Sequence, residues 1–295
     1  MTTLRTFPVE EFLWGLGAAV LALLAAAVVS RRHPDHALVM GLVTTAAALG
    51  AISRTWSVVP AALLGLVGVA AALAWLDRRR VPTRPSLTTA AVLMAPFAAV
   101  LAVDASSTGW VRGLIGASIV LGALAASRTD AAWGETGVPP VLYAITAAGV
   151  FAAVPDTEQA ATLLGASVPM ALCGWPLGHA RLGPTGAGAA TALLVWVAAV
   201  GGRGREPSII GAVACLGLLV TLPAGRWLAV RAGHPRALGR GRPAAVPLVF
   251  VHLVVVAVAS RVAGVTSDLE VAIPVAVVTM LVALAASVWL DATQP

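Results

Sequence analysis

The stretch that decides the fold class is LEVAIPVAVVTMLVALAASVWL, at positions 269–290. Its one charged residue is Glu270, next to its start, and nearly all of the other residues are apolar. A helix rises about 1.5 Å per residue, so roughly twenty such residues cross the hydrocarbon core of a bilayer. The stretch therefore predicts a transmembrane helix.

Runs of the same kind fill the rest of the chain. Hydrophobic residues make up 59% of the sequence and charged residues 11%, whereas a soluble protein has about 25% charged residues. Apolar runs separated by charged residues or by Gly and Pro predict about eleven spans. The expected spans are 12–30, 37–53, 57–76, 86–103, 109–127, 137–154, 159–178, 184–202, 207–226, 243–260 and 269–290. We therefore expect an all-α polytopic helical bundle that forms a single transmembrane domain over residues 1–295, with short loops and no soluble domain.

Arginine placement predicts the orientation of these spans, because basic residues close to a span stay in the cytoplasm. If the N-terminus is outside, thirteen arginines fall in inner segments and five in outer segments. The outer five are Arg5, Arg54, Arg203, Arg205 and Arg261. This asymmetry predicts an N-out/C-in topology, which needs an odd number of spans. Tryptophan prefers the headgroup level, and each tryptophan except Trp196 lies at or near an expected span end.

The composition also indicates the source and the cellular location. The chain contains neither Lys nor Asn, and its bias towards Arg, Ala, Val, Leu and Gly suggests a bacterium with a GC-rich genome. We therefore expect a multi-pass protein of the plasma membrane of such a cell. The residues before the first apolar run are not basic as in a secretory signal peptide, so we interpret that run as a retained span.

Several chemistries are excluded by residues that the sequence lacks. Without lysine there is no Walker A loop and no Schiff-base lysine, so P-loop ATP hydrolysis is excluded. The patterns HExxH, CxxC, GxSxG and GxGxxG are absent too. The net charge of +6 comes from arginines between spans and does not indicate nucleic-acid binding. We expect no nucleotide, no cofactor and no metal, and we interpret Cys173 and Cys215 as small buried hydrophobes.

Two short acidic pairs lie in the expected outer segments. They are Asp156 and Glu158, in the sequence PDTE at 155–158, and Asp268 and Glu270, in the sequence SDLE at 267–270. Carboxylates at this spacing can share a divalent cation or act as acid and base on an outer substrate. The alternative is N-capping, since each pair lies at the start of an expected span, where side-chain oxygens satisfy free amides.

Two further titratable or charged residues fall inside expected spans. His252 lies near the middle of the tenth span, where a titratable group is a candidate for a proton path or a ligand contact. A neutral imidazole that bonds a carbonyl or a Thr hydroxyl is the alternative. Arg112 lies about one turn inside the fifth span, so its guanidinium can reach outward or pair with an outer acid such as Asp104.

One internal resemblance bears on function. Pro60 precedes the triplet Trp75-Leu76-Asp77 by the same step as Pro274 precedes Trp289-Leu290-Asp291. Related halves of this kind frame a central site in many transporters. A coincidence that arises from the biased composition is the alternative.

Three functions are compatible with these residues. The first is a permease or lipid flippase that is not driven by ATP, with Arg112, His252 and the two acidic pairs along its substrate or proton path. The second is a membrane-embedded subunit or scaffold that docks other membrane proteins. The third is an extracytoplasmic transferase or hydrolase of lipid-linked substrates, which the short loops disfavour. The expected partners are membrane lipids and, for the second function, other membrane proteins.

Overall fold

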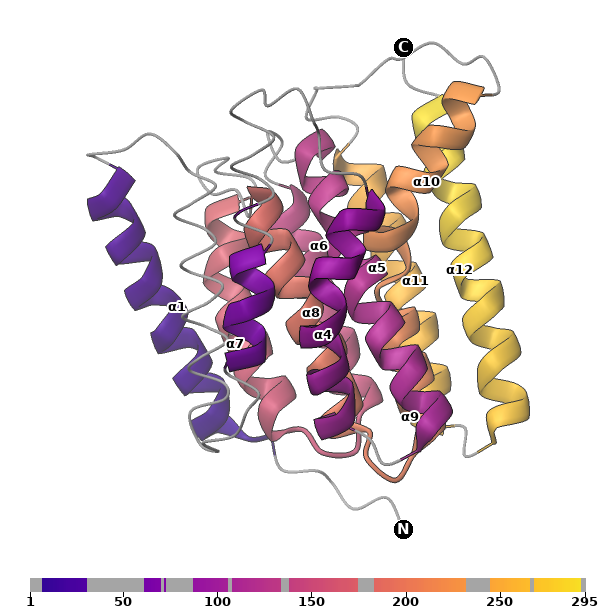
Figure 1. The fold of residues 1–295 in the computed structure, drawn as a ribbon, viewed down its shortest axis with the longest axis horizontal. Coiled ribbons are helices and arrows are strands. Elements are labelled where there is room, and N and C mark those ends of the chain that lie inside the picture. The colour runs from indigo at the N-terminus through magenta and orange to yellow at the C-terminus, as the bar shows by residue number, and fades with distance from the viewer. Residues whose placement is uncertain are drawn as a thin grey trace.

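The structure is a computed structural model that describes residues 7–30, 61–69, 72, 87–105, 108–133, 138–174, 183–231, 245–265 and 268–292. Over these residues every regular element is an α-helix (Figure 1). The helices are α1 (Val9–Ser30), α4 (Leu87–Ala105), α5 (Gly109–Trp133), α6 (Val138–Ala153), α7 (Glu158–Gly174), α8 (Gly183–Gly201), α9 (Glu206–Ala214), α10 (Gly217–Arg231), α11 (Ala245–Val265) and α12 (Leu269–Ala292). Positions 61–69 are also helical. The all-α prediction is confirmed for this part of the chain.

Several of the described helices have the length and the apolar composition of membrane-spanning helices. Three are long and apolar enough to cross one, in the stretches Gly109–Ala126, Val246–Ala263 and Leu269–Trp289. The pair α9 and α10 passes the same test as one broken span, which makes up to four within the described ranges. The expected span at 37–53 and half of the one at 57–76 lie outside the described residues, as do Pro60 and the triplet Trp75-Leu76-Asp77 of the internal resemblance.

The described helices follow the expected ranges closely, with one difference. The run 207–226 was expected as one span but forms α9 and α10, which are bent by 46° at their junction. At the junction the Leu216 N–H donates to the Val213 carbonyl at 3.0 Å, which is a tighter turn than the α-helix makes. Cys215 and Leu216 are themselves apolar, so hydropathy does not change at this break and the sequence pattern continues across it.

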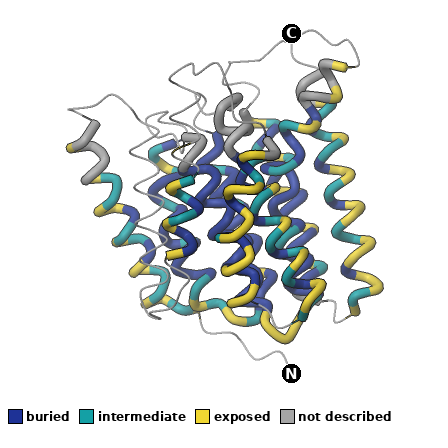
Figure 2. The backbone as a smooth tube through the Cα atoms, viewed as in Figure 1, coloured by how far each residue is buried: buried dark blue, intermediate teal, exposed yellow. Residues whose placement is uncertain are grey.

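The core is centred on α8. Its residues are buried on every side from position 186 to 201, where the tube in Figure 2 is dark blue. The helices α4, α5, α6, α7 and α9 pack around it. The helices α1 and α12 lie at opposite edges of the bundle (Figure 1), where α1 packs on α7 and α12 packs on α9, α10 and α11. The central helix is thus enclosed by the other helices, and the two edge helices are largely exposed.

Several turns between helices gather at one end of the bundle, at the bottom of Figure 1. The Phe7 ring before α1 lies 5.4 Å from the Phe151 ring near the end of α6. The Asp156 N–H donates to the Gly201 carbonyl at 3.0 Å, which joins the α6–α7 turn to the α8–α9 turn. We call this the carboxylate end, because the following acids lie in turns or in first or last helical turns there: Glu10, Glu11, Asp104, Asp156, Glu158, Glu206, Asp268 and Glu270.

Candidate functional site

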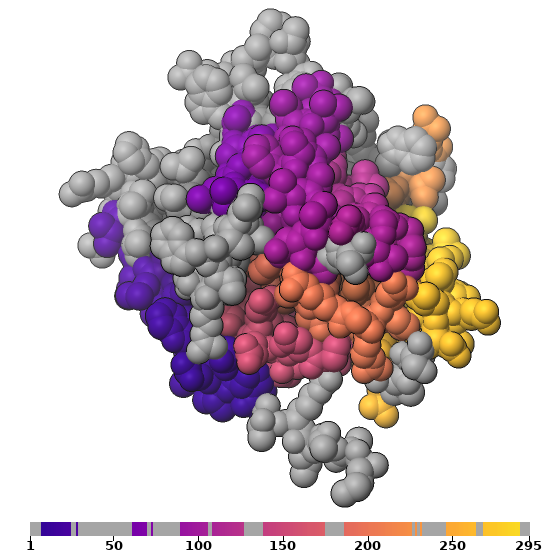
Figure 3. Space-filling view, turned by 60° about the horizontal axis from the view of Figure 1, so that its bottom comes forward, coloured from indigo at the N-terminus to yellow at the C-terminus, as the bar shows by residue number. Residues whose placement is uncertain are grey.

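A charged pocket opens at the carboxylate end. Its volume is about 1010 Å³, and its walls come from the α4–α5 junction, the α8–α9 turn and the starts of α9 and α12. Figure 3 brings this end forward and shows α4 and α5 next to α8 and α9, with α12 beyond them. The charged and polar lining residues are Asp104, Thr108, Arg112, Arg203, Arg205, Glu206, Asp268 and Glu270.

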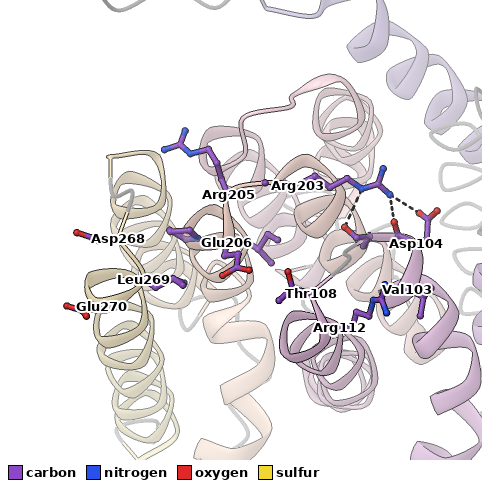
Figure 4. Close-up of a pocket in the computed structure, with 14 residues that line it drawn as sticks. Val103, Asp104, Thr108, Arg112, Arg203, Arg205, Glu206, Asp268, Leu269 and Glu270 are labelled. Atoms are coloured by element: carbon purple, nitrogen blue, oxygen red, sulfur yellow. Dashed lines mark hydrogen bonds and ion pairs between the residues drawn. The ribbon is translucent and has the colours of Figure 1, made fainter.

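One wall of the charged pocket is fixed by Arg203 (Figure 4). Its guanidinium donates to the Asp104 and Ala105 carbonyls, the latter at 3.3 Å, and lies 3.4 Å from the Asp104 carboxylate. An arginine at this place satisfies the free carbonyls at the C-terminal end of α4. The ion pair is half exposed, so it contributes little stability and serves mainly to position the wall.

The interior tryptophan that departs from the interfacial pattern belongs to the same wall. The Trp196 indole N–H, in α8, donates to the Asp104 carboxylate at 3.2 Å. A buried indole needs such an acceptor. Asp104 therefore connects α4, α8 and Arg203. This role was predicted for none of these residues, although the unusual depth of Trp196 in its expected span was the available signal.

The remaining charged residues of the pocket differ in where they point. In Figure 4 the Glu206 carboxylate and the Thr108 hydroxyl face the middle of the pocket. The carboxylates of Asp268 and Glu270 point to the outer side of α12, whereas Leu269 between them points inward. The predicted residues Arg112, Asp268 and Glu270 therefore share one pocket, but the two acids lie at its rim.

The other predicted acidic pair lies elsewhere. Asp156 lies in the turn before α7 and Glu158 is the first residue of that helix; the Asp156 carboxylate accepts the Glu158 N–H at 3.4 Å. This is the capping arrangement that the sequence offered as the alternative. Neither residue is among those that line the charged pocket. Within the described ranges, no three His, Cys, Asp or Glu side chains come together in a way that could hold a metal ion.

His252 is completely buried in α11. Its Nε2 lies 2.9 Å from the Thr146 hydroxyl and 3.0 Å from the Leu142 carbonyl, both in α6. A carbonyl can only accept, so Nε2 carries a proton, and Nδ1 has no partner among the described residues. These contacts are the structural hydrogen bonds that the sequence offered as an alternative to a proton path, and they lie outside the charged pocket.

The same contacts extend to the break between α9 and α10. The Thr146 hydroxyl lies 3.5 Å from the Cys215 carbonyl, and the Cys215 thiol lies 3.4 Å from the Gly211 carbonyl. A Cβ on Gly149 would overlap the Val256 side chain of α11 and lie 3.0 Å from the Cys215 sulfur, so glycine lets α6 approach both α11 and the break closely. The His252 and Thr146 pair thus braces irregular backbone that would otherwise be costly inside a membrane.

An apolar groove lies next to the charged pocket. It has a volume of about 580 Å³ and is lined by Trp110, Leu114, Ser118, Ile210, Val213, Ala214, Thr221, Ile273, Ala276, Val277, Met280, Leu281 and Leu284. The pocket and the groove share three walls in α5, α9 and α12, and Ile209 lines the pocket where Ile210 lines the groove. Thr221 is 7% exposed, and its hydroxyl has no partner among the described residues.

Comparison with known proteins assigns the chain to no family. The chain matches no protein-family model and no curated protein. The functional conclusion is therefore drawn from the charged pocket, the apolar groove and the broken helix.

Proposed function

We propose that the chain is a plasma-membrane permease or lipid flippase that is not driven by ATP. The observation that carries this proposal is the helix break at Cys215 and Leu216, which lies in the wall of an apolar groove next to a charged pocket. Broken helices of this kind form the substrate sites of many secondary transporters. Irregular backbone at membrane depth is tolerated where it is buried in protein or lines a cavity.

The topology that belongs to this function is about eleven spans, with the N-terminus outside and the C-terminus inside. The arginine asymmetry supports it. The directions of α1 and α12 support it too. Both helices begin at the carboxylate end and finish at the other end (Figure 1), as an odd number of spans requires. In this orientation the charged pocket faces the outside of the cell.

The broken helix gives this arrangement a way to move. The α9 segment carries the pocket residues Arg205 and Glu206 at its start and packs on α11 and α12. A change in the 46° bend would tilt α9 against α10 and alter the junction of pocket and groove. Without a Walker A loop, the driving force would be the gradient of the substrate or of a coupled ion.

Flippase activity is testable in liposomes that contain the purified chain and a fluorescent phospholipid. Addition of dithionite reports the fluorophores that reach the outer leaflet. We expect faster loss of protected fluorescence than in protein-free liposomes, and equal rates would contradict the proposal. Glu206→Gln should slow the loss about tenfold, because a charged hydrogen-bond partner is removed from the pocket.

Glu158→Gln is the matched control for this variant. Glu158 and Glu206 are each the first residue of a helix at the carboxylate end, and only Glu206 is among the residues that line the pocket. We expect the control to flip lipid at the rate of the unmodified chain. Equal loss in both variants would argue for a general effect of surface charge and against a role for the pocket.

A further inference from the structure

We propose that the apolar groove holds the hydrocarbon tail of a membrane phospholipid whose headgroup carries both a phosphate and a primary ammonium and lies in the charged pocket. This inference names the substrate class of the proposed function. It describes a binding site, so it also stands or falls independently of transport.

The position of the groove suits a tail that enters from the bilayer. Its walls are α5 and α12, and the broken helix α9–α10 forms its floor. The mouth is lined by side chains that face outward, since Trp110 is 49% exposed and Val277 is 52% exposed. In a membrane these faces border lipid tails, so a neighbouring lipid reaches the groove without crossing water.

The length of the groove also suits one leaflet. The lining of α12 runs from Ile273 to Leu284, which is roughly 16 Å at 1.5 Å per residue. That is about half of the 30 Å hydrocarbon core of a bilayer. Because the groove and the charged pocket are lined by neighbouring residues of α5, α9 and α12, a tail in the groove would bring the headgroup of the same molecule to the pocket, which Thr108 and Glu206 line.

The charges of the pocket indicate a headgroup with both signs. Arg112 and Arg205 line the pocket and supply positive charge that attracts a phosphate. In Figure 4 the Glu206 carboxylate faces the middle of the pocket, whereas the Arg205 guanidinium points away from it. A headgroup that is only anionic would be repelled by the Glu206 carboxylate, and one that is only cationic would be repelled by the arginines. A zwitterionic headgroup satisfies both.

The lining also distinguishes two kinds of ammonium. Quaternary ammonium groups are recognised by aromatic cages. Among the described residues that line the charged pocket, none is aromatic. A primary ammonium can instead donate hydrogen bonds to the Glu206 carboxylate, so the pocket fits an ethanolamine headgroup better than a choline headgroup.

The experiment uses the full chain in liposomes with phospholipids that carry a photoreactive diazirine in one acyl tail. Three such lipids with identical tails are compared, namely phosphatidylethanolamine, phosphatidylcholine and phosphatidylglycerol. After irradiation, the labelled positions are mapped by mass spectrometry. We expect labels on the groove residues of α12 and α9, about tenfold more from phosphatidylethanolamine than from either other lipid.

Two neighbouring valines provide a variant and its matched control. Val277→Trp fills the groove, whereas Val278→Trp adds the same ring next to it on α12, outside the residues that line the groove. Both side chains are more than half exposed, at 52% and 57%, so both variants should fold. We expect groove labelling to fall at least fivefold in the first variant, about the effect of a blocked site, and to persist in the second.

Three results would overturn the inference. They are equal labelling by the three headgroups, equal labelling of the groove and of the exposed face of α11, and persistence of the groove label in Val277→Trp. The result can be separated from that of the flippase assay. A labelled groove without lipid flipping would refute lipid transport and support the binding site. Lipid flipping without a groove label would refute the binding site and support transport.

Discussion

The two edge helices, α1 and α12, make contacts of opposite kinds with the bundle. The α1–α7 seam is closed, because backbone meets backbone at Gly15 and Gly165, where an added Cβ would overlap the partner helix. By contrast, α12 rests on a broken helix and leaves a groove of about 580 Å³ between itself and α5. Both helices are apolar and amply exposed, so hydropathy does not separate them. The difference is that α1 packs closely on α7, whereas α12 packs closely on α10 where Gly225 meets Ser287 and also forms one wall of the groove.

The largest expected effect tests the closed seam. Gly15→Leu would force a side chain into the Thr162 carbonyl and the Ala166 amide of α7. Overpacking of this kind costs about 1–3 kcal/mol or more, so we expect a clearly lower unfolding temperature in detergent. Gly17→Leu is the control, since a Cβ at Gly17 meets nothing within 4 Å. Similar unfolding temperatures for the two variants would mean that α1 does not pack tightly on α7.

The next effect concerns the brace of the broken helix. His252→Leu removes the donor to the Thr146 hydroxyl and the Leu142 carbonyl, and we expect a loss of about 1–3 kcal/mol in unfolding free energy. His252→Gln keeps an N–H donor at a similar position and should retain stability and lipid flipping. If His252→Gln folds normally but abolishes flux driven by a proton gradient, His252 is part of a proton path and the bracing interpretation fails.

The smallest effect lies in the open groove and has the opposite sign. Thr221→Val removes a buried hydroxyl that has no partner among the described residues, so we expect a gain of about 1 kcal/mol in unfolding free energy. Thr279→Val is the control, because its hydroxyl donates to the Val275 carbonyl at 2.7 Å and its loss should destabilise. If the Thr221 hydroxyl contacts a passing headgroup, the first variant should also flip lipid more slowly. A destabilised Thr221→Val would show that this hydroxyl is already satisfied.

The positions of the described helices could be predicted from the sequence, because apolar run length is a one-dimensional property. The α11 helix was expected at 243–260 and lies at Ala245–Val265. The break at Cys215 could not be predicted, since hydropathy does not change there and the contacts of Cys215 with Thr146 of α6 and Val256 of α11 come from distant parts of the chain. For the same reason the sequence grouped Asp156 and Asp268 as similar turns, although one caps a helix and the other lies at the rim of a pocket.

The charged residues of the pocket illustrate a related limit of sequence patterns. Arg203 and Arg205 counted in the sequence only as exceptions to the arginine asymmetry. In the structure they belong to a turn with Gly204 at a φ of 77°, which lets the chain reverse between α8 and α9 at the pocket wall. The two arginines that depart from the arginine asymmetry were thus a sequence signal for the site. Trp196, which departs from the interfacial placement of tryptophan, was another.

The order of the groove walls along the chain has a consequence for biosynthesis. The residues of α5, α9 and α10 that line the groove are all synthesised before α12. Until α12 is inserted, the buried Thr221 hydroxyl and the apolar side of α9 lack their cover on that side. A nascent chain stalled before Leu269 would therefore have an incomplete bundle, and the proposed lipid site would form only once α12 is in place.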